Sequence, residues 1–224
     1  MRVINGWVES IPRDHSLTSG FYLLEELIMV INGFYVLKDN FFELVNDPFL
    51  KDNKHGNRPF YYCLKEEDSL TEMYWMIPLS SKIEKYSHII TEKELRNKPT
   101  DGLYICELPN NRKSVFLIQD MFPVLERFVE RDYTLGSNHL LLVKEHDIST
   151  INKKAKRVIK LIKRGIKLTP TSPDVLKIIS LLKKVDEDLK TIEAEIMEGV
   201  DDVDNGRVVD VESLLKEIKD KYRF

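Results

Sequence analysis

Cysteine is scarce in this sequence, and its scarcity excludes two classes of small protein. The 224 residues contain two cysteines, Cys63 and Cys106. Two thiols cannot build a disulfide-stapled secreted scaffold, and they cannot complete a four-cysteine zinc site. We interpret both as reduced thiols and predict a cytoplasmic protein.

Long hydrophobic runs and secretory features are also lacking. The longest apolar stretch lies near Phe21–Val36, and Glu25 and Glu26 interrupt it. A membrane-spanning helix needs about 20 apolar residues, so we expect no membrane association. No basic segment leads into an apolar core at the start of the sequence, so we expect no secretory signal.

Several familiar catalytic motifs are missing. The sequence has no phosphate-binding P-loop, no GxGxxG, no GxSxG and no HExxH. Its five histidines form no pair at the spacing of metal ligands. We therefore predict no metal and no cofactor.

Charge is unevenly distributed along the chain. The formal net charge is -3. Residues 33–168 carry a net positive charge, whereas residues 169–224 are acidic. This asymmetry favours an anionic partner for the middle of the chain, and a protein partner or self-interaction for its end.

Hydrophobic periodicity predicts an α+β fold. Two antiparallel hairpins are expected, Phe60–Leu64 with Glu72–Ile77 and Gly102–Glu107 with Ser114–Gln119. A strand is expected near Val30–Leu37, although a packed helix over Thr18–Ile31 fits equally well. Residues 1–32 are treated as an N-terminal extension of uncertain status.

Four helices are expected around these strands. They cover Asp39–Val45, Lys82–Arg96 after a Ser81 N-cap, and Ser149–Lys167, and a fourth starts at Thr171–Asp174 with Ser172 as N-cap. Apolar residues then alternate in steps of three and four from Val175 to Ile196, which predicts a helical seam. Residues 175–224 are read as a helical, acidic C-terminal extension, with a strand at Arg207–Val209 and a last helix at Val211–Tyr222.

The helix over Ser149–Lys167 is unusually basic. It carries eight Lys or Arg residues and no acidic residue between Ile151 and Lys167. Like charges at these spacings destabilise a helix, so an anionic ligand is favoured over a merely solvated face.

Small hydroxyls and cations are expected to gather at one end of the first hairpin. Lys54, Asn57 and Arg58 precede its first strand, and the segment Ser80–Lys85 follows its second. Hairpin geometry places these segments side by side. Hydroxyls and cations that converge in one cleft suit a phosphate.

Three segments carry a resemblance to a known family. Asn46–Cys63, Tyr74–Tyr86 and Ser114–Pro123 resemble the toxins of type III toxin–antitoxin systems, most closely the CptN group, with ToxN and AbiQ as more distant relatives. The resemblance covers residues 33–174, and the block from Trp75 to Tyr86 is its most specific part.

This resemblance implies a MazF-like fold, a twisted antiparallel sheet or partly open barrel with surrounding helices. It implies a metal-independent, sequence-selective endoribonuclease used in phage defence, which a small repeat-derived RNA antitoxin inhibits within a closed RNA–protein hetero-oligomer. Cleavage by the RNA's own 2′-hydroxyl would leave 2′,3′-cyclic phosphate and 5′-hydroxyl ends.

Site residues follow from the same resemblance, residue by residue. Its hydroxyl pair falls on Ser80 and Ser81, its lysine on Lys82 or Lys85 with Lys82 preferred, and its basic residue on Arg58 or Lys54. Gln119 matches the polar residue of the family in the third of these segments, Ser114–Pro123.

RNA-binding roles are expected for further residues. Tyr62 or Tyr61 would stack on a base, and Asn57 would contact RNA. The basic helix would supply phosphate contacts from Lys153, Lys156, Arg157, Lys160, Lys163 and Arg164. The alternatives are a non-catalytic RNA-binding protein of the same fold and a protein-interaction module centred on the C-terminal helices.

Overall fold

The chain divides into two compact units, and the boundary in the sequence falls between Leu181 and Leu182. The computed structural model describes residues 3–4, 7–8, 29–54, 56, 58–67 and 71–204. The unit boundary falls inside the last described helix, later than the predicted boundary between residues 174 and 175. No helix in these ranges is long and apolar enough to cross a membrane.

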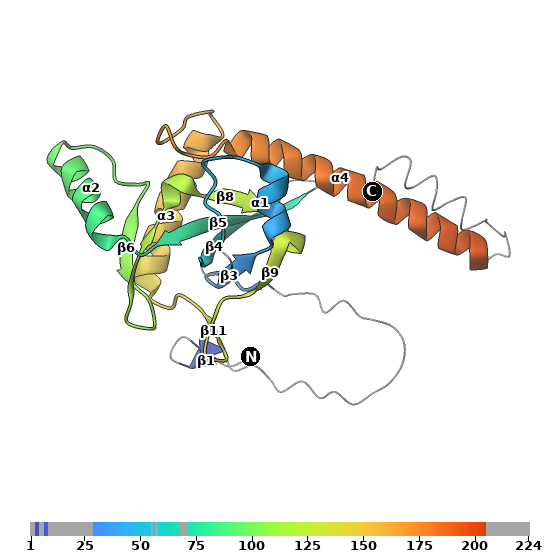
Figure 1. Ribbon diagram of the computed structural model, residues 1–224, viewed down its shortest axis with the longest axis horizontal. Helices are drawn as coiled ribbons and strands as arrows, with labels where there is room; N and C mark the ends of the chain where they lie inside the picture. Colours follow the sequence, from blue (N-terminus) through green and yellow to red (C-terminus); the bar gives the residue numbers. More distant parts are fainter. Residues whose placement is uncertain are drawn as a thin grey trace. The chain divides into compact units, whose positions relative to one another are not determined.

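A seven-stranded antiparallel sheet forms the centre of the first unit (Figure 1). Its path runs β6-β7-β5-β4-β3-β9, and β8 pairs with β5 beside this path. The strands are β3 (Phe34–Leu37), β4 (Phe60–Glu67), β5 (Glu72–Ser80), β6 (Tyr104–Glu107), β7 (Lys113–Phe116), β8 (Phe122–Val124) and β9 (Val129–Asp132). Both predicted hairpins, β4 with β5 and β6 with β7, are confirmed. The fold is α+β with a mostly antiparallel sheet.

A smaller antiparallel sheet has the order β1-β2-β11-β10. Its strands are β1 (Val3–Ile4), β2 (Trp7–Val8), β10 (Thr134–Leu135) and β11 (Asn138–Leu140). Part of the predicted N-terminal extension is therefore paired with β11. Most of the alternative helix over Thr18–Ile31 lies outside the described residues.

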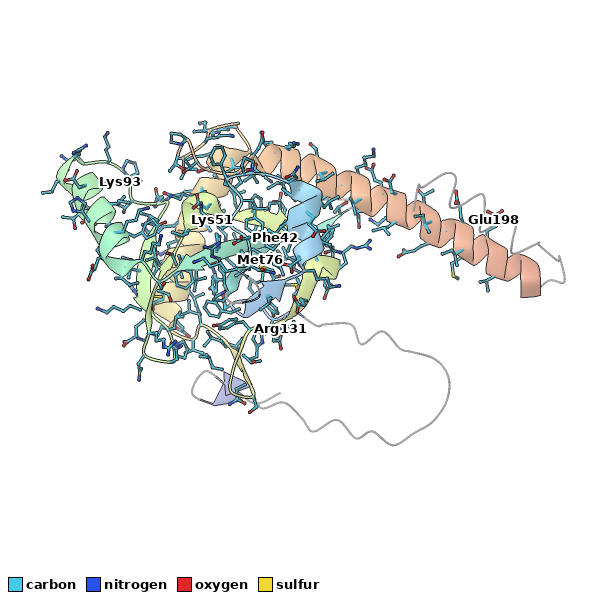
Figure 2. All side chains as sticks on the ribbon, in the orientation of Figure 1. Phe42, Lys51, Met76, Lys93, Arg131 and Glu198 are labelled. Atoms are coloured by element: carbon cyan, nitrogen blue, oxygen red, sulfur yellow. The ribbon has the colours of Figure 1, made fainter. Side chains whose placement is uncertain are left out.

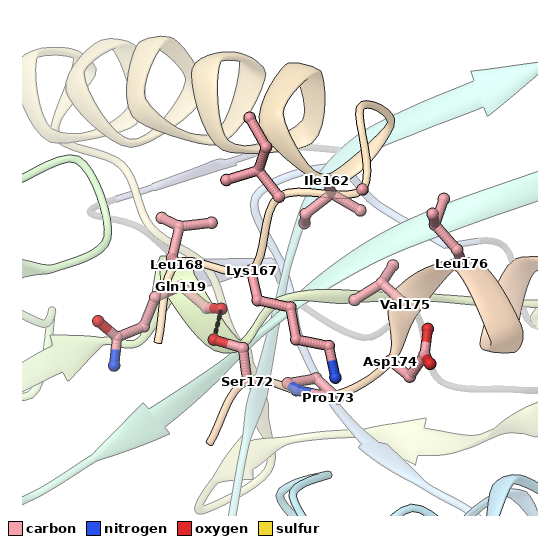
Figure 3. Close-up of a pocket in the computed structure, with 11 residues that line it drawn as sticks. Gln119, Ile162, Lys167, Leu168, Ser172, Pro173, Asp174, Val175 and Leu176 are labelled. Atoms are coloured by element: carbon pink, nitrogen blue, oxygen red, sulfur yellow. Dashed lines mark hydrogen bonds between the residues drawn. The ribbon is translucent and has the colours of Figure 1, made fainter. Parts of the chain in front are cut away.

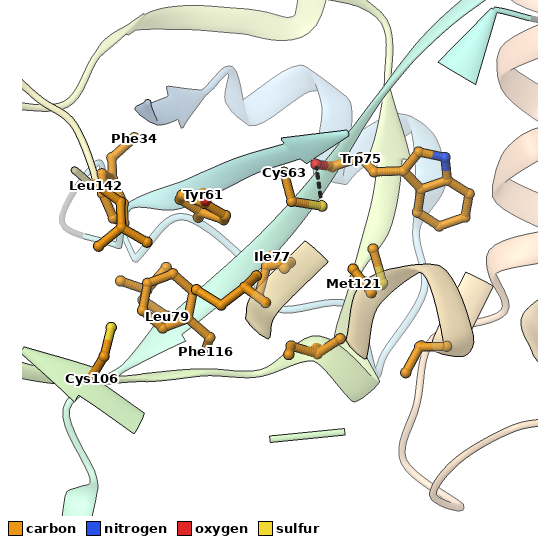
Figure 4. Close-up of a cluster of buried hydrophobic side chains, with 14 of the residues drawn as sticks. Phe34, Tyr61, Cys63, Trp75, Ile77, Leu79, Cys106, Phe116, Met121 and Leu142 are labelled. Carbon is orange, nitrogen blue, oxygen red and sulfur yellow. Dashed lines mark hydrogen bonds between the residues drawn. The ribbon is translucent and has the colours of Figure 1, made fainter. Parts of the chain in front are cut away.

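Both faces of the main sheet are covered. One face of β4 and β5 presents Tyr61 and Ile77 to a core cluster that includes Ile151 and Val158 of α3 (Glu145–Ile162) (Figure 4). On the other face, Phe60 lies 5.9 Å from Phe42 of α1 (Asp39–Val45), ring centroid to centroid. Alternation along each strand therefore fills two cores instead of leaving one face to solvent.

The helix ends correct several predictions. Helix α2 spans Ile83–Leu95, and Lys82 stands at its N-cap with no side-chain cap. Ser81 is therefore not the cap, because β5 runs on to Ser80 and the Ser80 Oγ accepts the Lys82 N–H. Helix α3 begins earlier than expected and ends at Ile162. Gly165, at φ 77°, terminates the helix in a Schellman motif. The Gly165 N–H donates to the Ile162 carbonyl, and the Ile166 N–H donates to the Leu161 carbonyl.

Helix α4 spans Val175–Asp204. The Asp174 carboxylate accepts the Lys177 N–H at 3.2 Å and caps this helix, whereas the Ser172 hydroxyl donates to the Gln119 carbonyl. Ser172 is therefore not the N-cap. Two short 3-10 helices, η1 (Ile118–Asp120) and η2 (Glu126–Phe128), complete the first unit.

The second unit is described by its part of α4 alone. Ile196, Met197 and Val200 expose 49%, 67% and 49% of their surface, and acidic residues such as Glu198 stand beside them (Figure 2). The strand and last helix expected within 205–224 lie outside the described residues.

Candidate functional site

A cleft of about 220 Å³ opens where β5 ends. Ser80 and Ser81 line it, and Ser80 is paired with Val115 of β7. The other polar residues of the lining are Lys54, Arg58, Asn110, Arg112, Lys113, Ser114 and Tyr133. Four cations and three serine hydroxyls therefore face one cleft.

The loop before β4 forms one wall of this cleft, as the sequence predicts. Arg58 donates from Nη1 to the Asp52 carbonyl at 2.7 Å and lies 3.4 Å from its carboxylate. Burial lowers the pKa of Arg58, although arginine remains charged at neutral pH. Asn53 anchors the loop by donating to the Leu37 carbonyl and the Asp39 carboxylate. Lys54 adopts φ 49°, a left-handed conformation, within this anchored turn.

The β6–β7 turn forms the opposite wall, which sequence reasoning missed. The Leu108 N–H donates to the Arg112 carbonyl, and Asn111 has φ 59°. Arg112 and Lys113 reach the cleft because β7 pairs with β5. Arg112 and Lys113 were visible in the sequence between the two strands of the second predicted hairpin, but the pairing of this hairpin with β5 was not.

Several predicted site residues lie elsewhere. Lys82 and Lys85 are exposed and do not line the cleft, and the Lys85 ammonium lies 5.4 Å from the Tyr86 ring centroid. The structure contradicts base stacking by Tyr62, which is 4% exposed. Tyr61 is fully buried as well. Asn57 lies outside the described residues.

Gln119 lines a different and smaller pocket, at the junction of α3 and α4 (Figure 3). This pocket has a mostly apolar lining that includes Ile162, Leu168 and Val175. The Ser172 hydroxyl closes one side by donating to the Gln119 carbonyl. Gln119, to which the resemblance gives an RNA-binding role, therefore does not line the cleft that contains Ser80 and Ser81.

A buried carboxylate lies behind the loop wall. Asp120 is 3% exposed, its Oδ1 has no hydrogen-bond partner among the described residues, and its Oδ2 lies 4.0 Å from the Lys51 ammonium. Burial raises the pKa of Asp120 to about 6, and the positive charges of Lys51 and Arg58 oppose this rise only in part.

The basic face of α3 is a second feature of this unit. Its apolar residues, among them Ile151 and Val158, are buried, so the cations project from the other side. Arg157 pairs with Asp101 at 3.0 Å, and Lys163 pairs with Glu66. Three exposed cations of α3 have no acidic partner among the residues that the structure describes, Lys153, Lys156 and Lys160. Arg164 is exposed as well and follows the end of the helix.

The cleft can bind a phosphate and stabilise negative charge on it. Fixed cations and hydroxyl donors around one point are the arrangement that recognises phosphoryl oxygens. Within the described ranges, no cluster of three or more histidine, cysteine or acidic side chains could hold a metal ion. A scan against protein-family models and a search of curated proteins both find no match to this chain.

Proposed function

We propose that this protein is an endoribonuclease toxin of the type III toxin–antitoxin kind. One observation carries the proposal: Lys54, Arg58, Ser80 and Ser81 line a single cleft. The sequence resemblance assigns the cleavage chemistry to these same residues. The antiparallel sheet of the first unit is compatible with a MazF-like architecture.

The reaction would be cleavage of RNA by its own 2′-hydroxyl. A base takes the proton of the 2′-hydroxyl as the 2′-oxygen bonds to phosphorus. The bond from phosphorus to the 5′-oxygen breaks, and the leaving oxygen takes up a proton from the protonated base or from water. Ser80 and Ser81 would donate to the non-bridging oxygens, and Arg58 would stabilise the added charge. Lys54 replaces Lys82 as the preferred base, because Lys54 lines the cleft and Lys82 does not.

The basic face of α3 would bind the antitoxin RNA. Its three exposed lysines without an acidic partner among the described residues, Lys153, Lys156 and Lys160, can contact phosphates without reading sequence. We propose a small repeat RNA as the partner, bound in an RNA–protein hetero-oligomer.

The test is cleavage of a mixed RNA pool in the presence of EDTA, with analysis of the product ends. Wild type is compared with Lys54→Ala and with the matched control Lys82→Ala. We expect 2′,3′-cyclic phosphate ends, about a hundredfold loss of rate in Lys54→Ala, and little change in the control. Equal losses in both variants, with both folded, would refute the cleft as the site.

A second candidate function is protein binding through α4. The exposed side chains of Ile196, Met197 and Val200 favour it. If the wild-type protein binds RNA but does not cleave it, it is a non-catalytic RNA-binding protein of the same fold. If it neither binds nor cleaves RNA, protein binding through α4 becomes the favoured function.

A further inference from the structure

Among the described residues that line the cleft, Tyr133 is the only aromatic one. Its backbone is fixed on both sides, since its N–H donates to the Phe34 carbonyl at 2.8 Å and its carbonyl accepts the Leu140 N–H at 2.9 Å. Its side chain is half-buried, and its hydroxyl has no hydrogen-bond partner within the described part of the chain. These hydrogen bonds fix the backbone of Tyr133, and the ring itself is supported by packing against the buried core cluster.

The surroundings of Tyr133 are apolar. Leu79, Leu108, Leu135 and Leu140 also line the cleft. The same cleft therefore combines cations and hydroxyls, which suit a phosphate, with an aromatic and aliphatic region, which suits the flat face of a base.

The volume limits what this region can hold. A cleft of about 220 Å³ is smaller than the roughly 300–1,000 Å³ of pockets that enclose drug-sized ligands. It has room for a single base, and a base that enters it must leave its stack.

We propose that Tyr133 is the specificity-determining residue of the cleft and stacks on one unpaired base next to the bound phosphate. This inference rests on the proposed function and adds the group that selects the cleavage position. Asn110, whose Oδ1 accepts the Arg112 N–H, lies in the same lining and offers its amide to the edge of that base. Tyr133 thus takes the stacking role that the sequence assigned to Tyr62.

The test compares Tyr133→Leu, which removes the ring, with Tyr133→Phe, which keeps it. Tyr86→Leu is the matched control, because Tyr86 is also a half-buried tyrosine but does not line the cleft. The probe is a random-sequence single-stranded RNA pool, and the readouts are the affinity and the sequence distribution at the cleavage positions. Thermal unfolding of each variant checks that it is folded.

We expect Tyr133→Leu to weaken binding by about 5- to 150-fold and to flatten the sequence preference, which is the loss expected for removing one base–aromatic stack. Tyr133→Phe and Tyr86→Leu should keep the wild-type preference. Should Tyr133→Leu fail to fold, cross-linking of 4-thiouridine RNA to the wild-type protein replaces it, with the adduct expected on Tyr133.

The outcomes separate the two proposals. If wild type cleaves RNA and Tyr133→Leu keeps its affinity and preference, or if the adduct maps away from the cleft, the role of Tyr133 is refuted and the nuclease remains. If wild type neither binds nor cleaves RNA, the proposed function fails and the role of Tyr133 fails with it.

Discussion

Replacing Asp120 with asparagine is expected to stabilise the fold at neutral pH. The carboxylate is buried, one of its oxygens is unpaired, and its pKa is about 6 in the folded protein against an ordinary value of 3.8. Each pKa unit corresponds to about 1.36 kcal/mol, so above pH 6 the ionised group lowers the free energy of unfolding by about 3 kcal/mol relative to a neutral one. Asparagine keeps the shape and removes the buried charge.

The sign of the effect fixes its pH dependence. The folded-state pKa is raised, so the stability linked to this group is fully present below about pH 4 and is lost as the pH rises through 6. The gain of Asp120→Asn should therefore be largest at pH 7–8 and shrink toward zero near pH 4.

Urea unfolding at several pH values measures this gain. Trp75, which is 1% exposed, makes fluorescence a reporter of the core. Asp52→Asn is the control, because the Asp52 side chain is 71% exposed and its replacement should change stability little. A gain of equal size at pH 4 and pH 8, or a loss of stability at pH 8, would refute the reasoning.

Two further predictions concern α3 and the start of β3. Replacing Lys153, Lys156 and Lys160 with glutamine should reduce the salt dependence of binding to single-stranded RNA. The slope of log affinity against log salt concentration should become shallower by about 2, because each lost phosphate contact removes about 0.7. Binding titrations from about 50 to 300 mM salt measure this slope. The charge-matched control replaces three exposed lysines elsewhere, Lys38, Lys177 and Lys184. Gly33→Ala should cost about 1–3 kcal/mol, because its Cβ would lie 2.7 Å from the His139 ring and 2.8 Å from the Val30 carbonyl; an unchanged melting temperature would contradict this.

The loop wall of the cleft could be predicted because its geometry is local. Arg58 and Ser80 come together through one hairpin whose strands are close in sequence. Turn residues between alternating apolar runs predict such a hairpin. Arg112 comes to the same place through the pairing of β7 with β5. Residues in contact through non-local pairing leave no local pattern, so the second wall could not be foreseen.

The prediction that Tyr62 stacks on a base was wrong for a different reason. Alternation along a strand predicts that one of two neighbouring residues faces solvent, provided that one face of the sheet is open. Here both Tyr61 and Tyr62 are buried, and the Tyr62 ring packs 5.4 Å from that of Tyr74. Whether the second face is covered depends on the whole fold and not on the strand itself.

The central position of β5 has a mechanical consequence for the cleft. The loop wall leads into β4 and the turn wall leads into β7, and these strands hydrogen-bond to opposite edges of β5. Neighbouring strands lie about 4.8 Å apart, so the two walls are two strand spacings, about 10 Å, from each other. Widening this gap would break ladder hydrogen bonds. The cleft therefore has a fixed width, and a ligand must adapt its own conformation to that width.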